Sequence, residues 1–153
     1  MVSIDITYEG DLHTEAKHGP SGATLSTDAP VDNHGRGQSF SPTDLVATGL
    51  GTCMATCMGI LAKKRGYELA GLRVNVKKLM TPPPRRIARL EVQIRVPKAA
   101  DATVDAAARA ALEEEARQCP VRLSLLAAIE VPLTFEWSAE GPSTTANHEG
   151  STG

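Results

Sequence analysis

The sequence predicts an α+β fold in which antiparallel β-sheets surround one long, buried helix. Two observations support this prediction. Segments that alternate apolar and polar residues cluster apart from the helical segments, as in an α+β chain. Residues 41–65 read as a helix without any charge between Leu45 and Ala62, and a helix that is apolar on every side has to be buried. Because one small sheet covers little of such a helix, we expect an intertwined homodimer.

The sequence marks both ends of this central helix. Ser41 suits the N-cap, because its hydroxyl can accept a hydrogen bond from a free N–H of the first turn. Pro42 fits the first helical position. Asp44 completes a capping box and places negative charge at the positive end of the helix dipole. At the other end, basic residues 63–65 precede Gly66, which can end the helix.

Two lines of residues along the helix differ in kind. One is a stripe of small residues that recur every four positions: Ala47, Gly51, Ala55 and Gly59. Another backbone can approach such a stripe closely, so we expect the dimer to close there. The second line carries Cys53 and Cys57. The uncharged run is just long enough to span a bilayer, but its glycines and threonines favour a buried position in a protein core.

Length, composition and charge limit the possible functions. The chain has 153 residues, and we expect one domain over residues 1–137 and a disordered tail over residues 138–153. A formal net charge of −2 and only 3% aromatic residues indicate neither nucleic acid nor a membrane surface as a partner. We find no signal peptide, and three cysteines are an odd number for a secreted disulfide framework. A cytoplasmic protein is therefore expected.

Three strands and a long loop are predicted before the central helix. Residues 2–8 alternate as in a half-buried strand, residues 12–17 read as a weaker second strand, and residues 23–26 as a short third strand. Residues 28–40 form a loop rich in Gly, Asn and Pro that contains Arg36. A long loop that leads directly into a cysteine-bearing helix favours a functional role.

A hairpin, two helices and a strand are predicted after the central helix. The hairpin joins residues 72–79 to residues 87–96 through a proline-rich connector. The remaining elements are helix 102–118, helix 121–128 and strand 129–137. Asp101 or Thr103 can cap the first of these helices. Cys119 lies at the break between these two helices, because the residue before a proline is disfavoured in the α conformation.

The three cysteines differ in what they can do. A free cysteine on an apolar helix is most often a small buried hydrophobe, and this interpretation suits Cys57 best. Cys119 lies before Pro120 at a helix start, where free N–H groups would lower its pKa and favour a thiolate. Cβ atoms four residues apart on a helix are about 5–6 Å apart, whereas a disulfide needs about 3.5–4.5 Å. If Cys53 needs a resolving thiol, Cys119 is therefore a better candidate than Cys57.

A Cys/His metal site is the competing interpretation. Two cysteines four apart on a helix can face one ion, with Cys119 and a histidine completing the set. The available histidines are His13, His18, His34 and His148. This cysteine spacing is not usual for zinc, and no two histidines are placed helpfully. We therefore predict no metal and no other cofactor.

Three segments together resemble the OsmC/Ohr superfamily of thiol-dependent peroxidases, which act on organic hydroperoxides. They are SPTDLVATGLGTCMATCM, ARQCPVRLSLL and IEVPLTFEW. The resemblance covers residues 2–137 and implies an intertwined homodimer with a reactive cysteine on a buried helix at the dimer interface. By this resemblance, Cys53 matches the peroxidatic cysteine and Cys119 the resolving cysteine, whereas Cys57 has no counterpart.

The resemblance also implies a mechanism and a role in the oxidative stress response. The Cys53 thiolate attacks the peroxide O–O bond, releases an alcohol and becomes a sulfenic acid. Cys119 condenses with it to a disulfide, and an external dithiol such as a lipoyl group restores both thiols. Organic hydroperoxide and dithiol are thus the expected small-molecule partners.

One departure from the family pattern concerns the activation of Cys53. In the family's hydroperoxide reductases an arginine stabilises the thiolate, and a glutamate directly after the helix's first proline holds it. Here that position is Thr43, and Asp44 lies one residue on, rotated by about 100°. We expect Asp44 to cap the helix, and Arg36 is the candidate arginine. The missing glutamate keeps open a non-catalytic alternative with this fold, a redox sensor or a small-molecule binder.

Overall fold

The central helix, α1 (Pro42–Lys64), begins at the predicted cap. The Ser41 hydroxyl accepts a hydrogen bond from the Asp44 N–H at 3.1 Å, and the Asp44 carboxylate accepts one from the Ser41 N–H at 2.8 Å. These reciprocal bonds form the predicted capping box. Lys63 and Lys64 lie in the last turn, where the helix dipole favours positive charge. The prediction of α1 is therefore confirmed at both ends.

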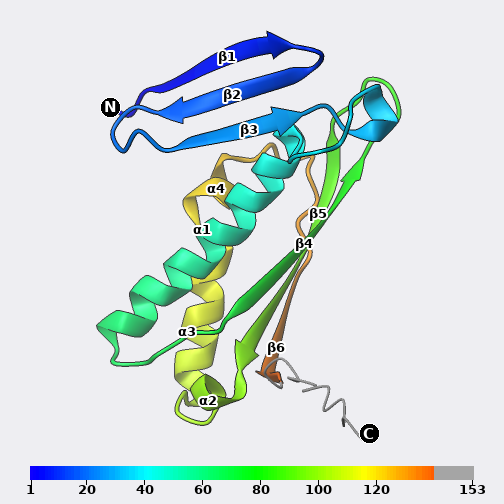
Figure 1. Cartoon of the computed structure of the whole chain (residues 1–153). Coiled ribbons are helices and arrows are strands. Elements are labelled where there is room, and N and C mark those ends of the chain that lie inside the picture. Colours follow the sequence, from blue (N-terminus) through cyan, green and yellow to red (C-terminus); the bar gives the residue numbers. More distant parts are fainter. Residues whose placement is uncertain (140–153) are drawn as a thin grey trace, which may run out of the picture.

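The computed structural model describes residues 1–139 and places two three-stranded sheets near α1 (Figure 1). The first sheet consists of β1 (Ile4–Gly10), β2 (His13–His18) and β3 (Thr24–Asp28). The second consists of β4 (Arg73–Met80), β5 (Ile87–Pro97) and β6 (Leu133–Ala139). A short 3₁₀ helix, η1 (Val31–Asn33), lies within the predicted long loop. The α+β class is confirmed. Ser138 and Ala139 were expected in the disordered tail but belong to β6, and the rest of the predicted tail, from position 140 onward, lies outside the described residues.

The second sheet is mixed, which corrects the prediction of antiparallel sheets. β4 and β5 form the predicted antiparallel hairpin, with Val76 opposite Val92. β6, however, runs parallel to β5, with Phe135 opposite Ile94. Parallel neighbours need a crossover connection, and the helices between β5 and β6 provide it. The first sheet is antiparallel throughout, as predicted.

The helices after β5 also differ from the prediction. They are α2 (Lys98–Asp101), α3 (Ala106–Arg117) and α4 (Pro120–Ser124). The single helix predicted over residues 102–118 is wrong at its start, because Asp105 is the N-cap of α3 and accepts from the Ala108 N–H at 2.8 Å. Asp101 cannot cap α3, since it lies within α2 and pairs with Arg109 at 2.5 Å.

The end of the described chain is more extended than predicted. Helix α4 stops where Leu125 adopts an extended conformation, so the helix predicted over residues 121–128 is too long. The final strand begins four residues later than predicted. Pro132 explains the delay, because a proline has no N–H to donate to a β-ladder. The carbonyl of Pro132 still accepts from the Val92 N–H at 2.9 Å.

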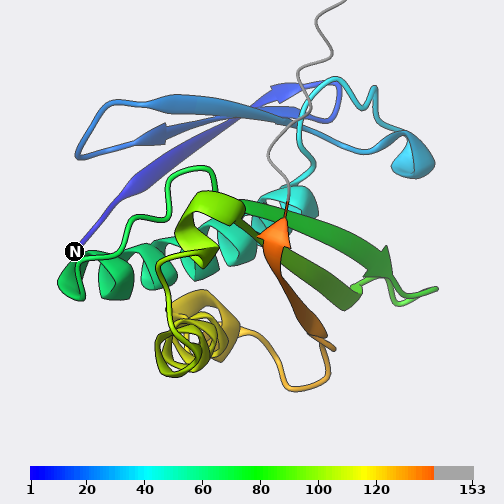
Figure 2. The same cartoon turned by 90° about the horizontal axis from the view of Figure 1, so that it is seen from below.

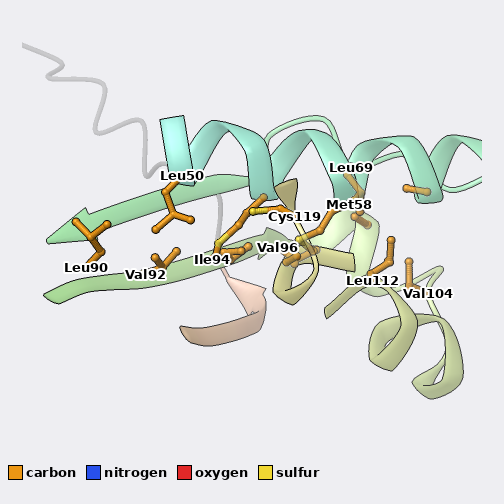
Figure 3. Packing of buried hydrophobic residues seen from close by; sticks show 14 of the residues in the cluster. Leu50, Met58, Leu69, Leu90, Val92, Ile94, Val96, Val104, Leu112 and Cys119 are labelled. Atoms are coloured by element: carbon orange, nitrogen blue, oxygen red, sulfur yellow. The ribbon is translucent and has the colours of Figure 1, made fainter. Parts of the chain in front are cut away.

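One face of α1 packs into a core between the second sheet and α3. The fully buried side chains of this core come from α1, β5 and α3: Leu50, Met54, Met58, Leu90, Val92, Ile94, Val96 and Leu112. Figure 3 shows Cys119 among these side chains. Burial of one such side chain contributes about 1.5–3 kcal/mol, so this face fixes the position of α1.

The opposite face of α1 is exposed in a single chain, so its predicted burial on every side requires a second chain. Val46 and Ile60 are 37% and 51% exposed. Figure 2 shows the first sheet on one side of α1 and α3 on the other. Within residues 1–139, α1 is the one helix long and apolar enough to cross a membrane, with a mean hydropathy of 1.7. A core helix of a soluble protein meets the same criteria.

The small-residue stripe is used partly within the chain, which modifies the predicted dimer contact. A Cβ at Gly51 would lie 3.0 Å from Val76 Cγ2 and 3.2 Å from Val74 Cγ1. The valines of β4 therefore occupy this part of the stripe. At Gly59, by contrast, no heavy atom of the described residues comes within 4 Å of an added Cβ. Only the second half of the stripe is open to another chain.

Candidate active site

Three free thiols gather where α4 meets α1. The Cys53 side chain lies close enough to Cys57 and to Cys119 to raise the pKa of both thiols. Cys119 is completely buried, while Cys53 and Cys57 are half-buried. The structure thus brings together the two cysteines that the sequence pairs, and it adds Cys57 as a third member. We call these three residues the thiol cluster.

The break before α4 positions Cys119 in this cluster. Pro120 occupies the first turn of α4, and Cys119 is the N-cap in an extended conformation. Its Sγ atom accepts a hydrogen bond from the Arg122 N–H at 3.4 Å. The Arg122 guanidinium donates to the Arg117 carbonyl at 3.2 Å, which ties the start of α4 to the end of α3. The Cys-Pro sequence therefore points the thiol inward toward α1.

The protonation of Cys119 differs from the prediction. Burial raises the pKa of the Cys119 thiol, and this effect exceeds the opposing effect of the Arg122 N–H. The neighbouring Cys53 thiol raises the pKa further. The expected lowering by the helix start is therefore wrong, because a fully buried thiolate loses more solvation than one amide restores. Cys119 is a neutral thiol at rest.

Cys57 is also a neutral thiol at rest. Burial raises its pKa, and the nearby Cys53 and Glu115 raise it further. Glu115 lies on α3, which packs against α1. The surroundings of Cys57 therefore favour its protonated form.

Asp44 has the capping role that the sequence predicts, and it also binds a lysine. Lys78 Nζ lies 2.6 Å from Asp44 Oδ1 and donates to Thr43 Oγ1 at 2.7 Å. Partial burial raises the pKa of Asp44, but hydrogen bonds from Lys78 and Ser41 together outweigh it, and the net pKa lies below the usual value. Asp44 is therefore an ionised structural group at the start of α1.

Lys78 is the residue of this region that the sequence reasoning missed. It points to the inner face of β4, in phase with Val74, Val76 and Met80, and its side chain is only 15% exposed. A lysine at an apolar position of an alternating strand is the signal that could have identified it, because a buried ammonium needs partners.

Lys78 lies at the edge of a cavity of about 970 Å³ between α1 and β4. The walls combine apolar side chains with hydroxyl groups: Phe40, Ala47, Thr48, Thr52, Ala55, Leu72, Val74 and Val76. Cys53 does not line this cavity. The cavity and the thiol cluster therefore occupy different sides of α1.

Arg36, the predicted partner of Cys53, lies at the protein surface. Its Nη2 atom donates to Asp11 at 2.9 Å, and the arginine side chain is 61% exposed. The positive charge of Arg36 helps to lower the pKa of Asp28. Arg36 as the cation for Cys53 stays a prediction, and to act in that role it has to exchange Asp11 for the thiolate.

The loop that carries Arg36 is held by a buried carboxylate. Asp28 Oδ1 lies 2.5 Å from His13 Nδ1, and Asp28 Oδ2 accepts from the Gln38 N–H at 3.0 Å. The His13 hydrogen bond is the main cause that holds the pKa of Asp28 below its usual value. This arrangement fastens the loop to the first sheet.

The predicted alternative of a metal site requires a converging set of ligands. Within residues 1–139, no three side chains of His, Cys, Asp or Glu are placed so that they could hold one metal ion. Two of the four histidines have other partners, since His13 binds Asp28 and His18 Nδ1 lies 2.6 Å from Ser21 Oγ.

Comparison with known proteins assigns this arrangement to a family. A family model described as OsmC-like protein matches residues 35–134. The chain belongs to the OsmC-like family. Both cysteine-bearing segments lie within the matched residues, so membership supports a role in redox chemistry or stress. No match was found among curated proteins.

Solved structures of OsmC-like proteins share the fold. One from Psychrobacter arcticus, named for an osmotic stress induced and detoxification response, is 37% identical, with a TM-score of 0.82 over 89% of this chain and 96% of that chain. An organic hydroperoxide resistance protein from Legionella pneumophila is 14% identical, with a TM-score of 0.68 over 89% and 96%. One from Elizabethkingia anophelis is 19% identical, with a TM-score of 0.69 over 89% and 95%. The last two show the fold alone.

Proposed function

We propose that this OsmC-like protein is a cysteine-based peroxidase that reduces organic hydroperoxides. The observation that carries the proposal is that Cys53 and Cys119 come from separate elements, α1 and α4, which contact each other and bring the two thiols close enough to interact. Thiols on two elements in contact can form a disulfide once their Cβ atoms come within about 3.5–4.5 Å of each other. The names of the hydroperoxide resistance proteins that share the fold support the choice of substrate.

In the proposed reaction, Cys53 is the nucleophile. Its thiolate attacks the distal oxygen of the hydroperoxide, the O–O bond breaks, and the alkoxide leaves as the alcohol after it takes a proton. Cys53 is then a sulfenic acid. Cys119 condenses with it, a disulfide forms, and water leaves. A half-buried Cys53 suits this chemistry, because peroxide can reach it while bulk solvent is partly excluded.

An external dithiol completes the cycle. Cys119 is fully buried, so the reductant has to attack the Cys53 sulfur of the disulfide. A slender dithiol such as a lipoyl group suits this access. We place the reaction in the cytoplasm, as part of the antioxidant defence.

A homodimer is part of the proposal. A single chain leaves an apolar surface on the first sheet, where Ile4, Ile6 and Tyr8 are all more than half exposed. It also exposes one face of α1. Soluble monomers rarely present apolar surface of this extent. A second copy that covers both surfaces would enclose α1 and complete the surroundings of Cys53.

The test is hydroperoxide consumption with a dithiol reductant. Wild-type protein should reduce cumene or t-butyl hydroperoxide with dihydrolipoamide, and Cys53→Ser should not. Cys57→Ser is the matched control, since it removes a thiol one turn away on the same helix. Equal consumption by wild type and Cys53→Ser would contradict the proposal.

A redox sensor is the second candidate, and the Arg36–Asp11 ion pair favours it. While Arg36 is bound to Asp11, it does not assist ionisation of the Cys53 thiol. A sensor would be oxidised by hydroperoxide in the same way but would turn over slowly with every dithiol. Single-turnover oxidation followed by intact mass measurement separates oxidation of Cys53 from steady-state turnover.

A further inference from the structure

A second cavity, of about 430 Å³, lies between the first sheet, the start of α1 and the connector from β4 to β5. We call it the connector cavity. Leu12, Pro30, Pro42 and Met80 supply apolar walls, and small-molecule sites of about 300–1,000 Å³ commonly combine such walls with a few polar groups. None of its lining residues belongs to the thiol cluster or lines the cavity beside Lys78.

Arg86 gives the connector cavity a positive charge that the chain does not neutralise. Within residues 1–139 its guanidinium donates one hydrogen bond, to the Ile87 carbonyl at 3.2 Å, and forms no ion pair. Arg85 also lines the cavity, but it donates to both carboxylate oxygens of Asp32, at 3.2 and 3.0 Å. None of the described lining residues is acidic. The cavity is therefore complementary to an anion, and a guanidinium suits a carboxylate because it can donate two parallel hydrogen bonds.

Two hydroxyl groups of the first sheet add a hydrogen-bond donor. Thr14 Oγ1 and Thr27 Oγ1 are 2.6 Å apart, and both residues line the cavity. Each hydroxyl can donate once, so the hydrogen bond between them leaves one proton without a partner in the described chain. Thr27 is only 6% exposed, and a buried donor is unfavourable unless another group accepts from it. A ligand with an oxygen acceptor would satisfy this donor.

Hydrogen bonds hold the walls of the cavity in place. The Thr81 N–H donates to the Arg86 carbonyl at 2.8 Å, and the Arg86 N–H donates to Thr81 Oγ1 at 3.0 Å. The Arg85–Asp32 pair fastens the same connector to η1. Ser41, on another wall, is 2% exposed and belongs to the capping box of α1. Because these walls are fixed before binding, a ligand that enters has to order little of the chain.

We propose that the connector cavity binds a small amphipathic monocarboxylate. The carboxylate pairs with Arg86, the threonine hydroxyls offer a second donor, and the hydrocarbon part lies against Met80 and the prolines. One unpaired arginine matches a monoanion, whereas a phosphate monoester carries close to two negative charges at neutral pH. The cavity beside Lys78 is larger but suits an anion less, because that ammonium is already paired with Asp44. The site is independent of the proposed peroxidase function.

Octanoate is the probe that tests this inference. Methyl-labelled methionine and NMR report where it binds, because Met80 lines the cavity whereas Met54 and Met58 are fully buried in the core. Octanoate should shift the Met80 methyl signal saturably and leave the two core signals unchanged. Octanol, which lacks the charge, should bind at least about tenfold more weakly. No shift at millimolar octanoate, a shift of the core signals in place of Met80, or equal binding of octanol would overturn the inference.

Two arginine variants separate the cavity from the surface charge of the protein. Arg86→Gln should weaken octanoate binding by at least about tenfold. Arg73→Gln is the matched control, because it removes the same charge from an exposed position on β4 outside the cavity and should leave binding unchanged. Equal weakening in the two variants would mean that net charge alone attracts the anion, and it would overturn the inference. Thermal unfolding verifies that both variants keep the fold.

Discussion

Lys78 Nζ lies 2.6 Å from Asp44 Oδ1 at the first turn of α1. This ion pair joins β4 to the start of the helix that carries two members of the thiol cluster. The same carboxylate accepts the Ser41 N–H, so a single side chain caps the helix and fixes it against the sheet. Because the Asp44 carboxylate is bound to Ser41 and Lys78, it stabilises the start of α1 and does not interact with the thiols.

Replacement of Asp44 should therefore destabilise the fold without changing the chemistry of Cys53. We expect Asp44→Ala to lower the free energy of unfolding by about 1–2 kcal/mol, as for loss of a helix cap. Urea denaturation at one protein concentration measures it. Asp11→Asn is the control, because asparagine tolerates the positive φ at this position and the exposed pair with Arg36 should contribute less than about 1 kcal/mol. Equal losses in the two variants would contradict this role.

The pH dependence of stability should reveal the Asp28–His13 contact. The pKa of Asp28 is lowered in the folded state, so its ionised form stabilises the protein above the unfolded pKa, near 3.8. That stabilisation is lost as the pH falls through the lower folded pKa. Asp28→Asn should be less stable than wild type at neutral pH, and the difference should shrink below pH 3.8. Urea denaturation over an acidic pH series checks this, and a constant difference would contradict it.

Two glycines of α1 should respond differently to alanine. Gly59→Ala should stabilise the protein by about 0.5–1 kcal/mol, because alanine favours the helix and an added Cβ has open space. Gly51→Ala should lose that gain, since its Cβ meets the side chains of Val74 and Val76. Thermal unfolding of the pair compares them. If a second chain covers Gly59, the gain there disappears as well.

The role of Arg36 can be separated from its surface ion pair. If Arg36 leaves Asp11 to stabilise the Cys53 thiolate, Arg36→Ala should slow the reaction with hydroperoxide by at least about tenfold, the equivalent of about 1.4 kcal/mol. Asp11→Ala should then speed it, because the arginine is released. Unchanged rates in both variants would show that Arg36 does not stabilise the Cys53 thiolate and only forms a surface ion pair.

Removal of the resolving thiol should leave a trapped intermediate. In Cys119→Ala, one equivalent of hydroperoxide should convert Cys53 to a sulfenic acid, because the helix geometry keeps Cys57 from condensing with it. Dimedone labelling followed by intact mass should detect the adduct. A loss of about 2 Da instead would mean that Cys53 and Cys57 do pair.

Much of the fold was predictable, because its signals are local. The capping box at Ser41 and Asp44 involves residues three apart, and the β4–β5 hairpin follows from alternation in neighbouring segments. The direction of β6 was not predictable, because it depends on where the crossover helices return the chain. The cap at Asp105 was missed because Asp101 competes for the role, and only its pairing with Arg109 excludes it.

The candidate site divides in the same way. The sequence by itself determined that Cys53 lies on an apolar helix, that Cys119 begins another helix, and that helix spacing disfavours a Cys53–Cys57 disulfide. Tertiary packing decided that all three thiols meet, that burial keeps Cys119 protonated, and that Arg36 pairs with Asp11. Spacing along the chain constrains neighbours within an element, whereas desolvation and contacts between elements depend on how those elements pack.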